Sequence, residues 1–231
     1  MVSSAIGSSF VPSFANLYAS GDIIRASEVF KVFRNLFLLM NTFFLMVALT
    51  MIVPFVRIYV GPNPDYNYIN PLLAICCTIM SLCSSFRLPC NLVVSSCGFF
   101  KQTWLQPLIT AFVSLIVSIL LGMISYPLVI CGPIVFYLVN FIYQQIVLHK
   151  LVPELVDNEV IRIGIVSIVG VLLSLLLSTF TVNINSLLNW IIVAIVVSLI
   201  TIGYIMLSSY LFNRRNWEKS FQFVQGLLIK H

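Results

Sequence analysis

Charged side chains are scarce in this sequence. Only 8 % of its 231 residues are Asp, Glu, Lys or Arg, whereas 60 % are hydrophobic, and the mean hydropathy is +1.07. Soluble domains carry about 25 % charged residues. A water-soluble fold could not hide this much apolar surface, so the composition excludes a soluble globular protein and predicts that the solvent is lipid.

The long apolar runs also lack the polar alternation of β-barrel strands. A chain that crosses lipid must satisfy its own backbone hydrogen bonds, which leaves helices or closed barrels. Each helix needs about 20 apolar residues. The sequence therefore predicts an all-α integral membrane protein with six transmembrane helices. The expected spans are residues 36–56, 70–95, 103–124, 126–148, 161–182 and 187–212.

Two further segments are predicted beside these spans. Ser20-Gly21-Asp22 can cap an N-terminal lead-in helix that continues into the first span. After the last span, an apolar face is typical of an interfacial helix on the inner leaflet, with an unstructured tail as the alternative. That face comprises Trp217, Phe221, Val224 and Leu228.

An acidic linker, residues 152–160, divides the chain into two expected parts. It carries Glu154, Asp157 and Glu159. Residues 1–151 would hold four of the spans, and residues 152–231 would hold a helix pair and the cytoplasmic tail.

Basic residues are unevenly distributed among the predicted loops. Only Arg57 falls in the loops of one side. Ten fall on the other side, namely Arg25, Lys31, Arg34, Lys101, Lys150, Arg162, Arg214, Arg215, Lys219 and Lys230. Loops rich in Lys and Arg stay in the cytoplasm. We therefore expect both ends of the chain in the cytoplasm, and the net charge of +5 requires no nucleic-acid partner.

Residue patterns of catalytic and metal sites are lacking. The sequence has no H-E-x-x-H, nucleophile elbow or phosphate loop, and none of its seven acidic residues lies in the middle of a predicted span. Cys76, Cys83, Cys90 and Cys97 recur every seven residues, without His, Asp or Glu nearby. We interpret them as packing residues, with a metal or redox role as the lesser alternative. The sequence predicts neither an enzyme nor a cofactor.

Arg87 is the one charged residue expected at depth within a span. Such residues are costly and usually face a bundle interior or a water-filled cavity. Ser84, Asn91 and Ser95 lie at −3, +4 and +8 from Arg87 and form a polar stripe on the same face. We predict that these four residues line a substrate cavity that receives an anion. The alternative is that Arg87 extends to the inner headgroups.

Small residues recur at every fourth position in two spans. One set is Ser114, Ser118 and Gly122, and the other is Gly170, Ser174 and Ser178. Faces of this kind allow membrane helices to approach closely. We interpret both sets as packing surfaces.

Several segments together resemble bacterial polysaccharide flippases, in the superfamily of multidrug, oligosaccharidyl-lipid and polysaccharide exporters. Residues 10–22, Phe-Val-Pro-Ser-Phe-Ala-Asn-Leu-Tyr-Ala-Ser-Gly-Asp, resemble a junction at which a helix returns to the cytoplasm. Pro54 and Gly61 match the end of the next span. Residues 91–101, Asn-Leu-Val-Val-Ser-Ser-Cys-Gly-Phe-Phe-Lys, resemble a turn of that family, and Gly132 fits the following hairpin. The resemblance covers most of the chain, through order and spacing.

The resemblance implies a polyprenyl-pyrophosphate-linked oligosaccharide as substrate, moved across a bacterial cytoplasmic membrane. In that reading Arg87 holds the pyrophosphate or an acidic sugar, while Ser84 and Asn91 line the sugar path. The family has twelve or fourteen helices in two lobes. The six spans here would match four helices of the second lobe and an extra C-terminal pair, so we expect a partial chain that lacks an N-terminal lobe.

Two other functions remain open on the sequence alone. A multidrug or small-molecule exporter of the same superfamily would tend to use buried acids for ion coupling, and none is visible here. A membrane assembly subunit that does not transport would need only the six spans.

Overall fold

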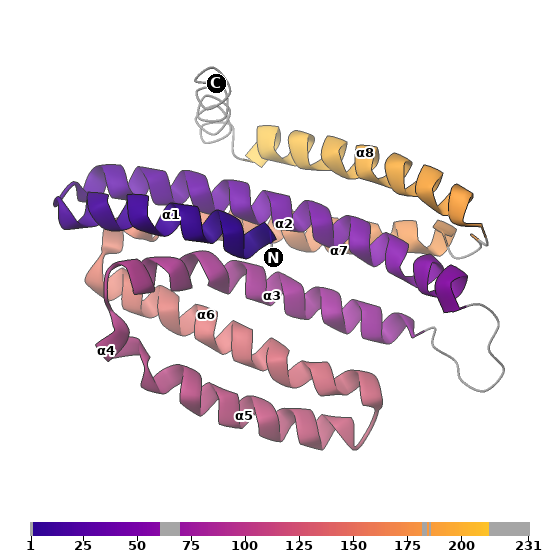
Figure 1. The fold of residues 1–231 in the computed structure, drawn as a ribbon, viewed down its shortest axis with the longest axis horizontal. Coiled ribbons are helices and arrows are strands. Elements are labelled where there is room, and N and C mark those ends of the chain that lie inside the picture. Colours follow the sequence, from indigo (N-terminus) through magenta and orange to yellow (C-terminus); the bar gives the residue numbers. More distant parts are fainter. Residues whose placement is uncertain (1, 61–69, 182–183, 185, 213–231) are drawn as a thin grey trace.

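The computed structural model describes residues 2–60, 70–181, 184 and 186–212, and these residues form helices and short connections (Figure 1). No strand occurs within these ranges. The long helices are α1 Val2–Ala19, α2 Ile23–Val60, α3 Pro71–Ser96, α5 Leu105–Gly122, α6 Cys131–Leu151, α7 Glu159–Thr181 and α8 Leu187–Phe212. Shorter turns are α4 Phe100–Thr103, η1 Tyr126–Ile130 and η2 Pro153–Leu155.

Six segments of the described chain are long and apolar enough to cross a membrane. Each overlaps one predicted span, so the all-α membrane fold class with six transmembrane helices is confirmed. The predicted C-terminal interfacial helix lies outside the described residues.

The N-terminal lead-in is the first part of α2. Asp22 caps this helix, because its Oδ1 accepts a hydrogen bond from the Arg25 backbone N–H at 3.2 Å. Gly21 has a φ of 79°, which a residue with a side chain rarely adopts, and it turns the chain from α1 into α2. Helix α2 is 38 residues long in total, and α1 lies along its first half (Figure 1).

Three turns of the chain meet at one end of the bundle. Phe14 of α1, Phe30 of α2, Val93 of α3 and Leu155 of η2 belong to one buried cluster. Tyr18 packs edge-on against Phe99, with 6.2 Å between the ring centroids. The turns at residues 20–22, 97–104 and 152–158 therefore lie together. We call this the basic end, since Arg25, Lys31, Lys101, Lys150 and Arg162 occur in or beside these turns.

A buried ion pair attaches the start of α7 to α2. The Arg34 side chain is 2 % exposed, and its Nη2 lies 2.6 Å from Asp157 Oδ1. Glu159 Oε2 lies 3.9 Å from the same Arg34 nitrogen, and Lys31 Nζ lies 3.9 Å from Asp157 Oδ2. Asp157 Oδ1 also accepts from the Glu159 backbone N–H at 3.2 Å. The acidic linker thus orders the first turn of α7 against α2.

The small residues of α7 allow it to pack closely on α2. Ser167 shares a hydrogen bond with Thr42 of α2 at 2.7 Å. A Cβ added to Gly170 would lie 2.8 Å from Met46 Sδ and 3.1 Å from Tyr204 of α8. Helix α8 is held by the Tyr204 hydroxyl, which donates to the Val166 carbonyl at 2.7 Å. The predicted packing role of Gly170 and Ser174 is confirmed, since Ser174 is fully buried.

The second small-residue face joins α5 to α6. A Cβ added to Gly132 would clash with Ser118 Oγ and with the Ser114 backbone oxygen. Ser118 Oγ donates to the Val129 carbonyl at 2.9 Å. The two helices therefore form an antiparallel hairpin. The outer face of α5 is exposed and apolar, as a lipid-facing surface requires.

Candidate functional site

Arg87 lies on α3, nine residues before the helix ends at Ser96, which corresponds to about 14 Å along the axis. Its Cζ is 5.3 Å from the Phe136 ring centroid and 5.8 Å from that of Tyr137, both on α6. Guanidinium groups are attracted to aromatic faces at this range. Arg87 Nε is buried without a hydrogen-bond partner among the described groups. The guanidinium is thus held by two rings and retains an unused donor.

The register of α3 against α6 shows in which direction the guanidinium extends. Helices α3 and α6 both end at the basic end, so they run parallel. Asn91 hydrogen-bonds to Gln144 and Cys90 to Gln145, so residue 141 lies roughly level with Arg87. The guanidinium instead lies over Phe136 and Tyr137, about 6 Å farther from the basic end at 1.5 Å per residue. Arg87 therefore reaches into the membrane span, away from the headgroups at the basic end.

Two polar side chains of α6, Asn140 and Gln144, lie about one and two helical turns from the rings that contact Arg87. Asn91 Oδ1 accepts from Gln144 Nε2 at 3.1 Å, and Asn140 Nδ2 donates to Thr110 Oγ1 of α5 at 2.9 Å. Asn140 is fully buried and Gln144 is 3 % exposed. Their oxygens, Asn140 Oδ1 and Gln144 Oε1, have no hydrogen-bond partner in the described part of the chain. Buried polar atoms of this kind are costly unless something pairs with them.

The remaining predicted residues share this region of α3 without forming a common bonded cluster. Ser84 is half-buried and Asn91 is exposed. Ser95 Oγ donates to the Leu92 carbonyl of its own helix at 2.8 Å. Pro89 is buried, and α3 runs through it as one helix. Arg87 and Asn91 therefore both contact α6, whereas Ser95 bonds within α3.

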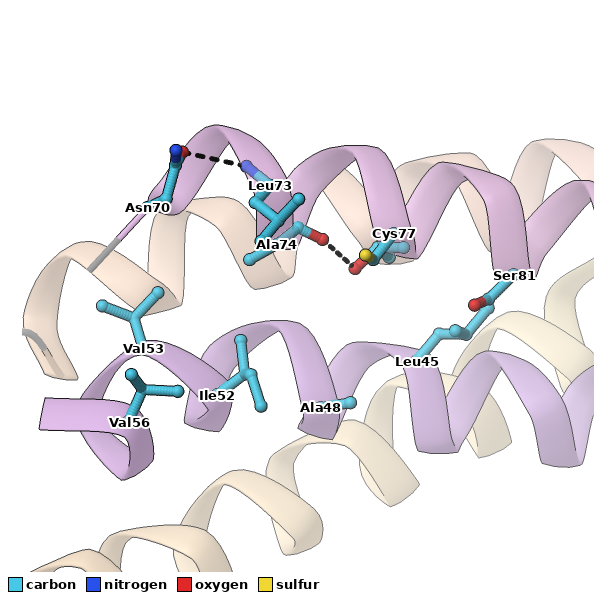
Figure 2. A pocket seen from close by; sticks show the side chains of 11 residues that line it. Leu45, Ala48, Ile52, Val53, Val56, Asn70, Leu73, Ala74, Cys77 and Ser81 are labelled. Atoms are coloured by element: carbon cyan, nitrogen blue, oxygen red, sulfur yellow. Dashed lines mark hydrogen bonds between the residues drawn. The ribbon is translucent and has the colours of Figure 1, made fainter. Parts of the chain in front are cut away.

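An apolar groove of about 330 Å³ opens between α2 and α3 (Figure 2). It lies in the halves of the two helices that are remote from the basic end. Figure 2 shows Ala48, Ile52 and Val56 of α2 facing Ala74 and Cys77 of α3. Asn70, at the outer end of the groove, caps α3 by accepting from the Leu73 backbone N–H at 3.1 Å. The groove is thus bounded by a capped, well-defined helix start.

Two cysteines of the stripe, Cys90 and Cys97, pack in the buried cluster at the basic end. Cys90 is fully buried and its Sγ accepts from Gln145 Nε2 at 3.0 Å. All six cysteines are free. Within the described ranges, no group of three or more His, Cys, Asp or Glu residues is placed to hold a metal ion.

Cys97, in the turn after α3, should be a slow nucleophile. Burial raises the pKa of its thiol to about 11, and only the thiolate reacts readily. In a variant that keeps Cys97 as its one cysteine, we expect alkylation by iodoacetamide at pH 8 to be roughly 100-fold slower than for an exposed thiol of pKa about 8.5. The rate should rise about tenfold per pH unit up to pH 10. A plateau near pH 9 would contradict this prediction.

The sequence prediction missed the polar residues of α5 and α6. Asn140 and Gln144 are one helical turn apart, and amides within an apolar span are themselves a signal, since they need partners in lipid. Gln106, whose Nε2 is buried without a partner among the described residues, and Thr110 repeat the same spacing on α5. Asn140, Gln144 and Gln106 could have been found by scanning the spans for amides.

Comparison with known proteins gives no match: no protein-family model, no curated protein and no solved structure is significantly similar to the chain.

Proposed function

We propose that this chain is part of a flippase that moves an oligosaccharide linked to polyprenyl pyrophosphate across a bacterial cytoplasmic membrane. The observation that carries the proposal is the guanidinium of Arg87, which lies within a span over two aromatic rings. Among the described residues, no acidic side chain forms an ion pair with it. A half-buried cation within a membrane span, without a carboxylate partner among the described residues, is suited to an anionic substrate.

A phosphate group matches this arrangement chemically. Guanidinium binds phosphate through paired N–H donors, and the low dielectric of a membrane span strengthens such contacts. The amides of Asn91 and Gln144, together with the Ser84 hydroxyl, offer donors and acceptors for sugar hydroxyls on the same side of α3.

Orientation and assembly belong to the same proposal. The ten basic residues on one side favour a cytoplasmic basic end, with both ends of the chain inside the cell. Alternating access requires two groups of helices that move against each other. We therefore propose that a second group of helices, outside this chain, moves against it during transport.

The test replaces Arg87 in the complete transporter of the source cell. Arg87→Gln removes the charge and is expected to lower surface polysaccharide by about 10- to 100-fold, the range for one lost charged hydrogen bond. Arg87→Lys keeps a charge and should retain part of the activity. Surface polysaccharide is measured together with the amount of protein in the membrane.

Arg162→Gln is the matched control, because Arg162 is exposed at the basic end. It should leave polysaccharide export unchanged. Normal export by Arg87→Gln, at a normal amount of membrane protein, would rule out the proposed role.

A further inference from the structure

The groove between α2 and α3 and the guanidinium of Arg87 border one continuous face of α3. Asn70, Ala74, Cys77 and Ser81 line the groove and are spaced by four, three and four residues, which keeps them on one helical face. Ser84 continues the same spacing toward the basic end, and Asn91 follows it at +7. Arg87 adjoins this face on the side of α6.

The two ends of this face differ in chemistry. The groove is lined mainly by aliphatic side chains and contains no charged residue. From Ser81 to Arg87 the helix advances six residues, or about 9 Å, and from Asn70 to Arg87 it advances seventeen, or about 25 Å. An apolar slot and a cation therefore lie along the same helix, within the thickness of one membrane. This arrangement is complementary to a molecule with an anionic head and a long apolar chain.

We propose that the groove between α2 and α3 binds the hydrocarbon chain of a polyprenyl phosphate, with the phosphate at Arg87. This inference rests on the proposed function for the identity of the carrier and assigns its chain to a specific surface. A lipid entering from the leaflet at the basic end has its head toward that end and its chain toward the middle of the membrane. Once the phosphate has moved inward from the basic end to Arg87, the chain extends farther in the same direction and reaches the groove.

The size of the groove favours a single chain. Its volume of about 330 Å³ is at the lower limit of small-ligand sites, which span roughly 300–1,000 Å³. Bilayer phospholipids carry two chains, whereas a polyprenyl phosphate carries one. Ala48 and Ala74, one from each wall, leave the space that the chain would fill (Figure 2).

The experiment uses a photoreactive polyprenyl monophosphate with a diazirine on one of the isoprene units nearest the phosphate. The complete protein is reconstituted in phosphatidylcholine bilayers and irradiated, and the labelled residues are mapped by mass spectrometry. We expect label between residues 45 and 56 of α2 and between residues 70 and 81 of α3. Unlabelled polyprenyl phosphate should compete, whereas phosphatidylglycerol, an anionic lipid with two chains, should not.

Two groove-filling variants and one control test whether labelling depends on the groove itself. Ala48→Phe and Ala74→Phe should each reduce labelling about tenfold, because the loss of roughly two buried methylene groups is enough for that change. Ile116→Phe lies on the exposed face of α5 and should label normally. Arg87→Gln should weaken labelling by the phosphate probe but not by the corresponding uncharged polyprenol.

Label that maps to α5 or α8, or that phosphatidylglycerol displaces as well as polyprenyl phosphate does, would overturn the inference. The mapping uses the unaltered protein, so it decides the matter even if a groove variant fails to fold. The probe carries no sugar and the assay needs no transport. Failure here is thus separate from failure of the export test, which depends on Arg87 in living cells.

Discussion

Replacing Arg34 by alanine is expected to lower the free energy of unfolding by about 3 kcal/mol. Arg34 is 2 % exposed and lies 2.6 Å from Asp157, which is itself 18 % exposed. Removing one partner of a buried ion pair costs roughly 3–5 kcal/mol, because the other charge is left without compensation. The partial exposure of Asp157 places the effect at the lower end of that range. The apparent melting temperature in detergent should fall by about 6–12 °C.

Two matched variants separate the ion pair from a general effect of losing positive charge. Arg25→Ala removes an exposed arginine of the same helix and should change the melting temperature little. Arg34→Met combined with Asp157→Leu removes both charges and should recover most of the stability, since apolar replacement of a buried pair is often neutral. If Arg34→Ala is as stable as Arg25→Ala, the ion pair does not hold α7 on α2.

The positions of the spans could be predicted because hydropathy responds directly to the solvent. The predicted span 187–212 coincides with α8, and the predicted span 70–95 differs from α3 by one residue at each end. The first span was predicted from residue 36, with a lead-in helix before it, and α2 is continuous from Ile23. Its first half is stabilised by α1, for example by Phe10 stacked 4.0 Å from Phe33. A hydropathy profile cannot predict this contact between α1 and α2, and so it could not predict where α2 begins.

The packing partners of the helices could not be read from the sequence in the same way. Helix α8 follows α7 in the chain, yet it packs extensively on α2, where Trp190 Nε1 donates to the Met51 carbonyl at 3.1 Å. Which apolar surfaces meet depends on side-chain shapes that periodicity does not encode. The sequence treats Arg34 as one of the loop cations, whereas the structure buries it against Asp157.

The candidate site was predictable along one helix and not between helices. The period of 3.6 residues places Ser84, Arg87 and Asn91 on a common stripe of α3, whatever the rest of the bundle does. The direction of the Arg87 guanidinium depends on Phe136 and Tyr137, about fifty residues later in the chain. The groove depends on the separation of α2 and α3, and so it appears only when both helices are placed.

Gly132→Ala is expected to destabilise the hairpin of α5 and α6 by about 3 kcal/mol or more. A Cβ at this position would overlap Ser118 Oγ and the Ser114 backbone oxygen. A side chain can rotate away, but a helical backbone oxygen cannot, so the two helices would have to separate. Separation weakens the bond from Ser118 to Val129 and the bond from Asn140 to Thr110. Overpacking of this kind costs roughly 1–3 kcal/mol before such losses are counted.

Two other glycines provide an internal scale for this measurement. Gly203 of α8 has no atom within 4 Å of an added Cβ, so Gly203→Ala should be neutral or stabilise its helix by up to about 1 kcal/mol. An alanine at Gly170 would meet the Met46 sulfur at 2.8 Å, but the flexible Met46 side chain can shift, and the cost should be intermediate. Thermal unfolding of the three variants in one detergent should rank them Gly132, Gly170, Gly203 from most to least destabilised. A Gly132→Ala variant as stable as Gly203→Ala would mean that the backbones of α5 and α6 are not in contact at Gly132. The hydrogen bond from Asn140 to Thr110, which requires the two helices to lie close together, would then need a different explanation.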